Sequence, residues 1–118
     1  MLAAHDRFAI QDMIARYINS CDNFDQDDAL TMVNDDGEIK LFVDGSDQPL
    51  LDLTGAAAFR DALAPRHAHH ESIGVQVRHL MQNLELVRVS DDCAELRCQV
   101  LVLYQRQQNS QDPAPRPV

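Results

Sequence analysis

Asp22 and His79 are the two residues of this sequence whose side chains, if paired, would do acid–base chemistry. Asp22 closes a segment with helical periodicity, residues 7–22, and His79 lies near the start of a long apolar segment, residues 76–89. A carboxylate that orients an imidazole makes a compact general base. In an apolar cavity the pair would abstract a proton from a bound molecule. The alternative is a structural ion pair near a helix end.

A first amphipathic helix is expected to position Asp22. Asp6 can cap its start, and residues 7–22 follow. Its apolar residues form a single stripe at helical spacing: Ile10, Ile14, Tyr17, Ile18 and Cys21. Asp22 comes four residues after Ile18, so its carboxylate lies at the margin of that stripe and not on the solvated face. Tyr17 lies on the stripe, where its ring packs in the core or its hydroxyl donates to a substrate oxygen.

The middle of the chain predicts short elements. A second helix is expected from near Asp25 over residues 27–33, followed by strands at 38–43 and 50–53. A third helix begins at Gly55 and is expected to end at Pro65. Residues 66–74 are then a solvated loop. Its histidines, His67, His69 and His70, have poor spacing for a metal site, so no metal is expected.

Two long strands, residues 76–89 and 94–105, are predicted to form an antiparallel hairpin that positions His79. The run Ser90, Asp91 and Asp92 between them is a turn signal. Apolar residues fall on both faces of the second strand, which indicates a sheet covered on both sides. Asn83 follows His79 by four residues, and it either bonds a neighbouring backbone group or contacts an oxyanion.

The composition fits one domain over residues 1–106, followed by a proline-rich loop or disordered tail at 107–118. The net charge of −9 argues against nucleic acid and anionic membranes as partners. No segment has the length of a membrane span or the pattern of a signal peptide, so a cytoplasmic location is expected. The cysteines, Cys21, Cys93 and Cys98, are expected to be buried small hydrophobic residues.

The order of elements predicts an α+β fold in which N-terminal helices pack on the concave face of a curved antiparallel sheet. Such a cone encloses an apolar interior that suits a small ligand. Side chains placed to line it, although apolar ones at such positions are also ordinary core, are Cys21, Phe24, Phe42, Phe59, Met81 and Asn83.

Three stretches resemble the SnoaL-like branch of the NTF2-like superfamily. They are residues 6–17 running into Cys21 and Asp22, residues 28–30 followed by 35–38, and residues 78–84. The resemblance covers residues 6 to about 105 and implies the cystatin/NTF2-like cone. The family pattern continues into two further strands with a Trp-containing end, whereas this sequence ends at Val118 and has no Trp. The resemblance therefore implies a C-terminally short member.

The family includes scytalone dehydratase, a dehydrochlorinase, polyketide cyclases and the small subunits of ring-hydroxylating dioxygenases. By motif position, Asp22 resembles the family's helix-end Asp and His79 its strand His. The resemblance implies that His79 is the base and that Asp22 orients it. Cys21 stands where the dehydratase has a Tyr, and no counterpart of its second pocket His is assigned.

Two hypotheses follow. The first is a lyase or isomerase without a cofactor, dehydratase- or cyclase-like, that acts on a small apolar cyclic substrate through His79, Asp22 and Tyr17. The second is a non-catalytic subunit that binds a small ligand or serves assembly, like a dioxygenase small subunit. Both predict a homodimer or larger homo-oligomer, because an apolar sheet face would otherwise be exposed.

Overall fold

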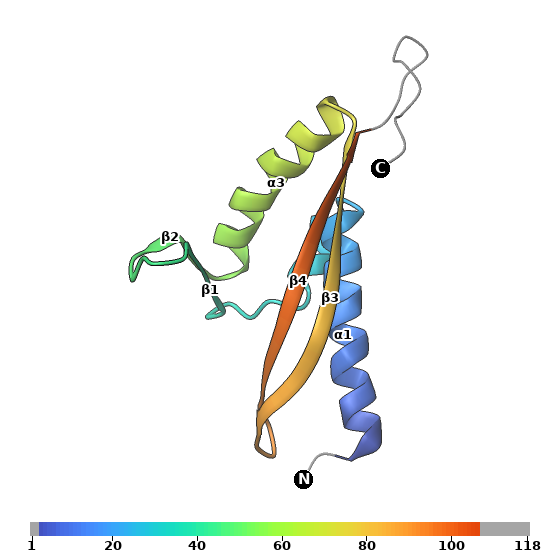
Figure 1. Cartoon of the computed structure of the whole chain (residues 1–118), viewed down its shortest axis with the longest axis vertical. Helices are drawn as coiled ribbons and strands as arrows, with labels where there is room; N and C mark the ends of the chain where they lie inside the picture. Colours follow the sequence, from blue (N-terminus) through green and yellow to red (C-terminus); the bar gives the residue numbers. More distant parts are fainter. Residues whose placement is uncertain (1–2, 107–118) are drawn as a thin grey trace. The chain divides into compact units, whose positions relative to one another are not determined.

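The computed structural model describes residues 3–106, which contain three helices and four strands (Figure 1). In chain order these are α1 (Ala4–Asp22), α2 (Gln26–Leu30), β1 (Glu38–Phe42), β2 (Pro49–Thr54), α3 (Ala56–Ser72), β3 (Val75–Val89) and β4 (Ala94–Arg106). The expected tail at 107–118 lies outside the described residues. The chain forms two compact units. We call residues 16–69 the middle unit and residues 3–15 with 70–106 the hairpin unit.

Helix α1 ends at Asp22, as its apolar period predicts. The residues of the predicted stripe are all half-buried, while most other α1 positions are exposed. The helix begins at Ala4, so the prediction that Asp6 caps it is wrong. Asp6 instead lies in the first turn, where its backbone N–H donates to the Ala3 carbonyl at 3.1 Å. A carboxylate there still complements the positive end of the helix dipole.

Helix α2 begins where the sequence predicts and ends three residues earlier than expected, at Leu30. Asp25 caps it, because its Oδ1 accepts from the backbone N–H of Asp28 at 3.1 Å. The two predicted strands are present as β1 and β2, and they pair antiparallel. Gly55 ends this hairpin with φ of 89°, and its N–H donates to the Gly37 carbonyl at 2.7 Å. Only glycine suits this position, because a Cβ would lie 2.7 Å from the Asp35 carbonyl oxygen.

Helix α3 differs most from expectation, because it continues through Pro65 to Ser72. The predicted helix end at Pro65 and the predicted loop at 66–74 are therefore wrong. Pro65 is exposed, whereas Phe59, Leu63 and His67, spaced four residues apart, are buried or half-buried. The buried side of α3, formed by Phe59, Leu63 and His67, therefore continues past Pro65, which lies on the opposite side of the helix. This packing offsets the backbone hydrogen bond that proline removes.

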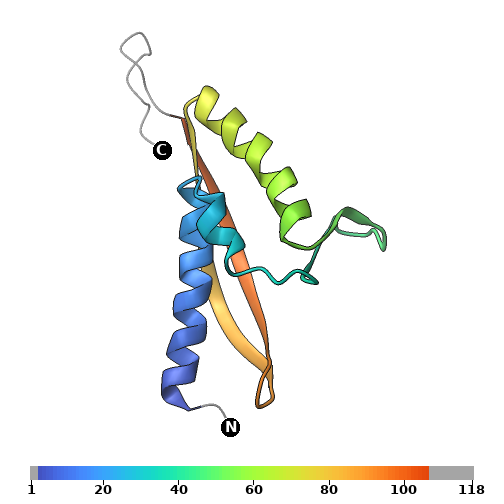
Figure 2. The same ribbon diagram turned by 180° about the vertical axis from the view of Figure 1, so that it is seen from behind.

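Strands β3 and β4 form the predicted antiparallel hairpin, and Ser90 closes its turn by donating from its N–H to the Cys93 carbonyl at 2.8 Å. The first half of α1, which belongs to the same unit, runs beside this hairpin in both views (Figures 1 and 2). The register shifts twice, and each shift places an extra residue on β3. Asn83 lies in the first bulge with φ of 55°.

Few side chains of the described residues are buried. The buried apolar residues are Ala29, Leu30, Phe59 and Val77, while many large apolar side chains on β4 are exposed. Cys21 is half-buried, but Cys93 and Cys98 are exposed, so the expectation that all three are core residues is wrong for these two. Cys93 lies in the turn before β4, and Cys98 lies opposite the first bulge of β3, so neither has a direct cross-strand partner in the hairpin.

Candidate functional site

Asp22, the predicted orienter, is a buried carboxylate at the C-terminal end of α1. Its exposed fraction is 3%, and only Ser20 and His67 are comparably buried polar residues among residues 3–106. The last turn of α1 contains no basic residue. The end of a helix carries partial negative charge, so a buried carboxylate there is costly unless a cation or hydrogen-bond donor faces it.

His79, the predicted base, lies in the regular first half of β3, opposite Val102 of β4. It is half-buried. Because side chains alternate along a strand, His79 shares its face with Val77 and Met81 and with their cross-strand partners Tyr104 and Val100. Val77 is buried, with 6% of its surface exposed. The imidazole thus projects from a predominantly apolar face, as a base that works on an apolar substrate requires.

Asp22 belongs to the middle unit and His79 to the hairpin unit. Because the two residues lie in different units, the pairing of the carboxylate with the imidazole stays a prediction. The surroundings of the Asp22 carboxylate and of the His79 imidazole are therefore considered within their own units.

Around the end of α1, the middle unit gathers aromatic side chains. The Tyr17 and Phe59 rings stack with centroids 6.1 Å apart and planes 22° apart. Burial raises the pKa of the Tyr17 hydroxyl, and the neighbouring Cys21 raises it further. Burial also raises the pKa of the Cys21 thiol. At neutral pH Tyr17 is therefore a protonated donor and Cys21 a neutral thiol, which suits a site that receives developing negative charge.

His67 is a buried residue that the sequence placed in a solvated loop. Its Nδ1 lies 2.9 Å from Oε1 of Gln26, and its ring centroid lies 5.2 Å from that of Phe24. Phe24 has φ of 60°, an uncommon backbone conformation for an aromatic residue. The four-residue spacing of Phe59, Leu63 and His67 is the sequence pattern from which the burial of His67 could have been predicted.

A polar network, partly buried at Ser20, joins α1 to α2. Arg16 forms an ion pair with Asp28, and the Ser20 hydroxyl donates to the same carboxylate at 2.5 Å. Both interactions hold the pKa of Asp28 below its usual range, and the Arg16 hydrogen bond has the larger effect. The network fixes the direction in which α1 ends and thereby the position of Asp22.

Three further predicted pocket residues have different surroundings. Phe42 on β1 is 52% exposed. Met81 is half-buried on the His79 face of β3. Asn83 is exposed, and its Nδ2 donates to Oε1 of Gln99 at 2.9 Å. Their contribution to a ligand pocket stays a prediction.

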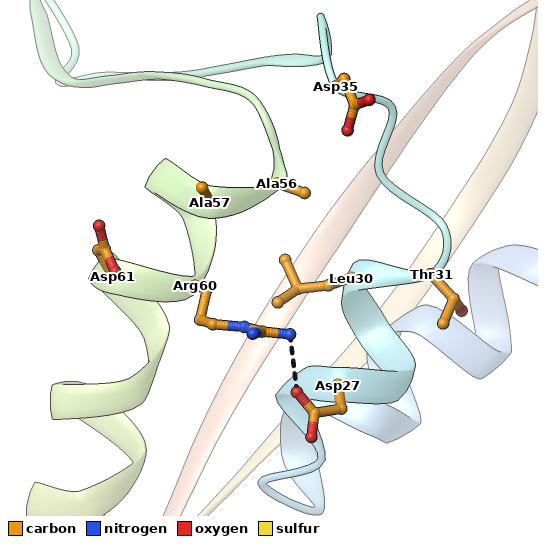
Figure 3. A pocket seen from close by; sticks show the side chains of 8 residues that line it. All are labelled: Asp27, Leu30, Thr31, Asp35, Ala56, Ala57, Arg60 and Asp61. Carbon is orange, nitrogen blue, oxygen red and sulfur yellow. Dashed lines mark hydrogen bonds and ion pairs between the residues drawn. The ribbon is translucent and has the colours of Figure 1, made fainter.

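Each unit contains a hollow that is lined only by its own residues. One, of about 470 Å³, separates α2 from the start of α3, and Figure 3 shows Arg60 reaching across it to Asp27, with an N–O distance of 2.9 Å. Its walls combine the apolar Leu30 with the carboxylates of Asp35 and Asp61. The other, of about 440 Å³, lies between the start of α1 and the β3–β4 turn. Neither hollow is lined by Tyr17, Asp22 or His79.

Two classes of site are not found in residues 3–106. No three His, Cys, Asp or Glu side chains in this part of the chain are grouped to hold a metal ion. None of the described helices is both long and apolar enough to cross a membrane.

Several solved structures share the α+β fold of this chain. A Novosphingobium aromaticivorans protein described as an aromatic ring hydroxylase matches with a TM-score of 0.74 and 24% identity, over 88% of this chain and 68% of that one. The beta subunit of benzoate 1,2-dioxygenase from Burkholderia mallei matches with a TM-score of 0.73 and 18% identity, over 92% and 72%. ActVI-ORFA from Streptomyces coelicolor matches with a TM-score of 0.64 and 20% identity, over 91% and 72%.

The SnoaL-like domain model matches residues 3–116. The chain therefore belongs to the SnoaL-like family, and the predicted resemblance and α+β fold class are confirmed. No curated protein is similar enough in sequence to match.

Proposed function

We propose that this chain is a lyase or isomerase that uses His79 as a general base and Asp22 as the residue that orients it. The observation that carries the proposal is the burial of the Asp22 carboxylate at the end of α1, with 3% of the residue exposed. An imidazolium is the kind of partner that makes such a carboxylate favourable. Membership of the SnoaL-like family supports the assignment of the partner to His79.

The proposed reaction begins with a proton on a carbon beside a carbonyl or a leaving group. His79 takes this proton, and Asp22 keeps the imidazole in the required tautomer and stabilises the imidazolium that forms. The Tyr17 hydroxyl, whose pKa burial raises above the ordinary tyrosine value, stays protonated and donates to the substrate oxygen as that oxygen gains charge. The substrate is a small, mostly apolar, cyclic or aromatic molecule, since apolar side chains accompany both His79 and Tyr17.

The test follows the proton itself, because the substrate is not identified. The chain is incubated in D₂O with a panel of cyclic and aromatic ketones and β-hydroxyketones, and NMR measures deuterium uptake at the carbon next to the carbonyl. We expect His79→Ala and Asp22→Asn each to reduce the exchange rate by about 10²–10⁴-fold, the usual contribution of a positioned base. Asp12→Asn, which changes an exposed carboxylate elsewhere on α1, is the matched control and should retain the rate.

Unchanged exchange in either variant, with circular dichroism showing an intact fold, would contradict the proposed roles. Equal exchange with and without protein over the whole panel would favour the second candidate.

The second candidate is a non-catalytic subunit that serves assembly or binds a small ligand. The exposed apolar side chains of β4 favour it. So does the fold shared with the beta subunit of a benzoate dioxygenase. This candidate predicts that His79→Ala and Asp22→Asn change neither the mass in solution nor the binding of a small aromatic molecule, measured by calorimetry.

A further inference from the structure

Phe24 lies at the end of helix α1 in a backbone conformation that usually requires glycine. Its φ is 60°, in the left-handed region where a Cβ atom crowds the backbone. Three hydrogen bonds close the helix around it, and their backbone N–H groups donate from Asn23 to Asn19 at 2.9 Å, from Phe24 to Cys21 at 3.2 Å and from Asp25 to Ser20 at 2.8 Å. This is the Schellman pattern, in which a residue with positive φ lets the chain leave the helix.

A strained residue of this kind persists only where contacts hold it in place, and such residues are concentrated at functional sites. A glycine here would close the helix without strain, but it would have no side chain to make a contact. The Phe24 ring contacts His67, with centroids 5.2 Å apart and planes tilted by 52°. This contact offsets the backbone cost, because a change of φ at Phe24 would move its ring away from His67.

His67 lies on the buried side of α3, and 7% of its surface is exposed. Its Nδ1 lies 2.9 Å from Oε1 of Gln26, the first residue of α2. An amide oxygen accepts, so Nδ1 carries the proton and the bond fixes the orientation of the ring. One imidazole thus contacts Phe24 in the α1–α2 turn and Gln26 in α2; we call these three residues the clamp. The proposed reaction gives this buried imidazole no role.

We propose that His67 is a positioning residue for Asp22, because it holds Phe24 in the left-handed conformation and thereby keeps the last turn of α1 closed. Asp22 lies two residues before Phe24, in the turn that the three hydrogen bonds close. Only 3% of Asp22 is exposed, so opening this turn would displace a buried carboxylate. The reaction that Asp22 serves rests on the proposed function, whereas the clamp is tested without a substrate.

The first experiment is amide hydrogen exchange by NMR on the full chain, which reports how often each backbone hydrogen bond opens. We expect His67→Ala to speed exchange of the amides of residues 23–25 by at least about 10-fold relative to amides in the middle of α1. Leu63→Ala is the matched control, since Leu63 lies on the same buried side of α3, one turn before His67. It weakens packing without removing the clamp, so exchange at the turn and in the middle of α1 should rise together.

Rescue by glycine distinguishes the clamp from packing alone. Phe24→Gly removes the strain that His67 offsets, so the double variant Phe24→Gly/His67→Ala should return the turn amides to within about 3-fold of the native rates. If the two rings only packed together, the double variant would exchange as fast as His67→Ala. That result, or native-like turn exchange in His67→Ala itself, would overturn the proposal. His67→Asn, which keeps an N–H donor for Gln26 but removes the ring beside Phe24, replaces His67→Ala if that variant does not fold.

The deuterium-uptake assay of the proposed reaction then measures the consequence for Asp22. We expect His67→Ala to slow uptake by about 10-fold and the double variant to recover it, because a small misplacement of an orienting group lowers the rate steeply. A double variant with restored turn protection but no recovered uptake would contradict the positioning of Asp22. If the native chain catalyses no uptake, the proposed function fails, and the turn amides still decide whether His67 holds Phe24.

Discussion

At the residue scale, burial distinguishes side chains that the sequence presents as equivalent. The sequence contains many carboxylates, yet Asp22 is the one Asp or Glu that is buried among residues 3–106. It likewise contains several histidines in the region 67–79, of which His67 is buried. These differences in burial depend on where each residue lies on its helix, because the position along the helix decides the direction in which its side chain points.

Tyr17 gives the first prediction at this scale, a dependence of stability on pH. Burial raises the pKa of its hydroxyl in the folded chain, so the folded state holds the proton more tightly than the unfolded state. The stabilisation is complete below the ordinary tyrosine pKa of about 10 and is lost as pH rises towards the higher folded value. Because Tyr17 is half-buried, the loss should stay well below the limiting value of about 1.4 kcal/mol per pH unit.

Urea unfolding of the native chain and of Tyr17→Phe at pH 8, 9, 10 and 11 measures this effect. The native chain should lose free energy of unfolding above pH 10, and Tyr17→Phe should lose less. Tyr104→Phe is the control, since that ring is 62% exposed. If the native chain and Tyr17→Phe followed the same curve, the hydroxyl would not be buried in solution.

At the element scale, the sequence correctly predicts the helices and strands that apolar periodicity determines. It does not predict features that depend on packing against other elements. The end of α1 at Asp22 and the β3–β4 hairpin follow from apolar periods of a helix and a strand. The continuation of α3 does not, because Pro65 predicts a helix end and only the burial of the stripe on the other side of the helix overrides it. The bulge at Asn83 has no signal in the apolar pattern either.

Among the predicted site residues, the surroundings of Asp22 and His79 could be anticipated in part. The margin of a helical stripe indicated that Asp22 is shielded, whereas the apolar neighbours of His79 became clear only from the register of β3 with β4. The contact of His67 with Gln26 and Phe24 could not be predicted, since it joins α3 to the α1–α2 turn. Such contacts depend on the tertiary fold and not on any local sequence pattern.

Pro65 gives the prediction at the element scale. If α3 runs through it, Pro65→Ala restores a backbone hydrogen bond and removes a ring that crowds the preceding turn, so the chain should be stabilised by about 1–3 kcal/mol. Urea or thermal unfolding measures the change. Ala64→Gly is the matched control on the same helix and should destabilise the chain by about 1 kcal/mol. A helix that ended at Pro65 would show little response to either substitution.

At the scale of the whole molecule, the described chain exposes more large apolar side chains than it buries, and five of the exposed ones are consecutive on β4. A small buried core gives a low intrinsic stability, because apolar burial is the main favourable contribution to folding. Association that covers β4 would therefore supply part of the folding free energy.

This coupling predicts that thermal stability depends on protein concentration. If the chain associates with itself through the exposed side chains of β4, as the predicted homo-oligomer requires, only the folded chain can do so. The melting temperature should then rise with concentration by roughly 3–5 °C for each tenfold increase above the dissociation constant. Leu101→Lys should melt at one temperature throughout the range, while Leu80→Lys should follow the native chain. Differential scanning fluorimetry from 1 to 100 μM measures all three. A native melting temperature that is constant over this range would show that the fold is stable without a partner, and the exposed β4 side chains would then need another explanation.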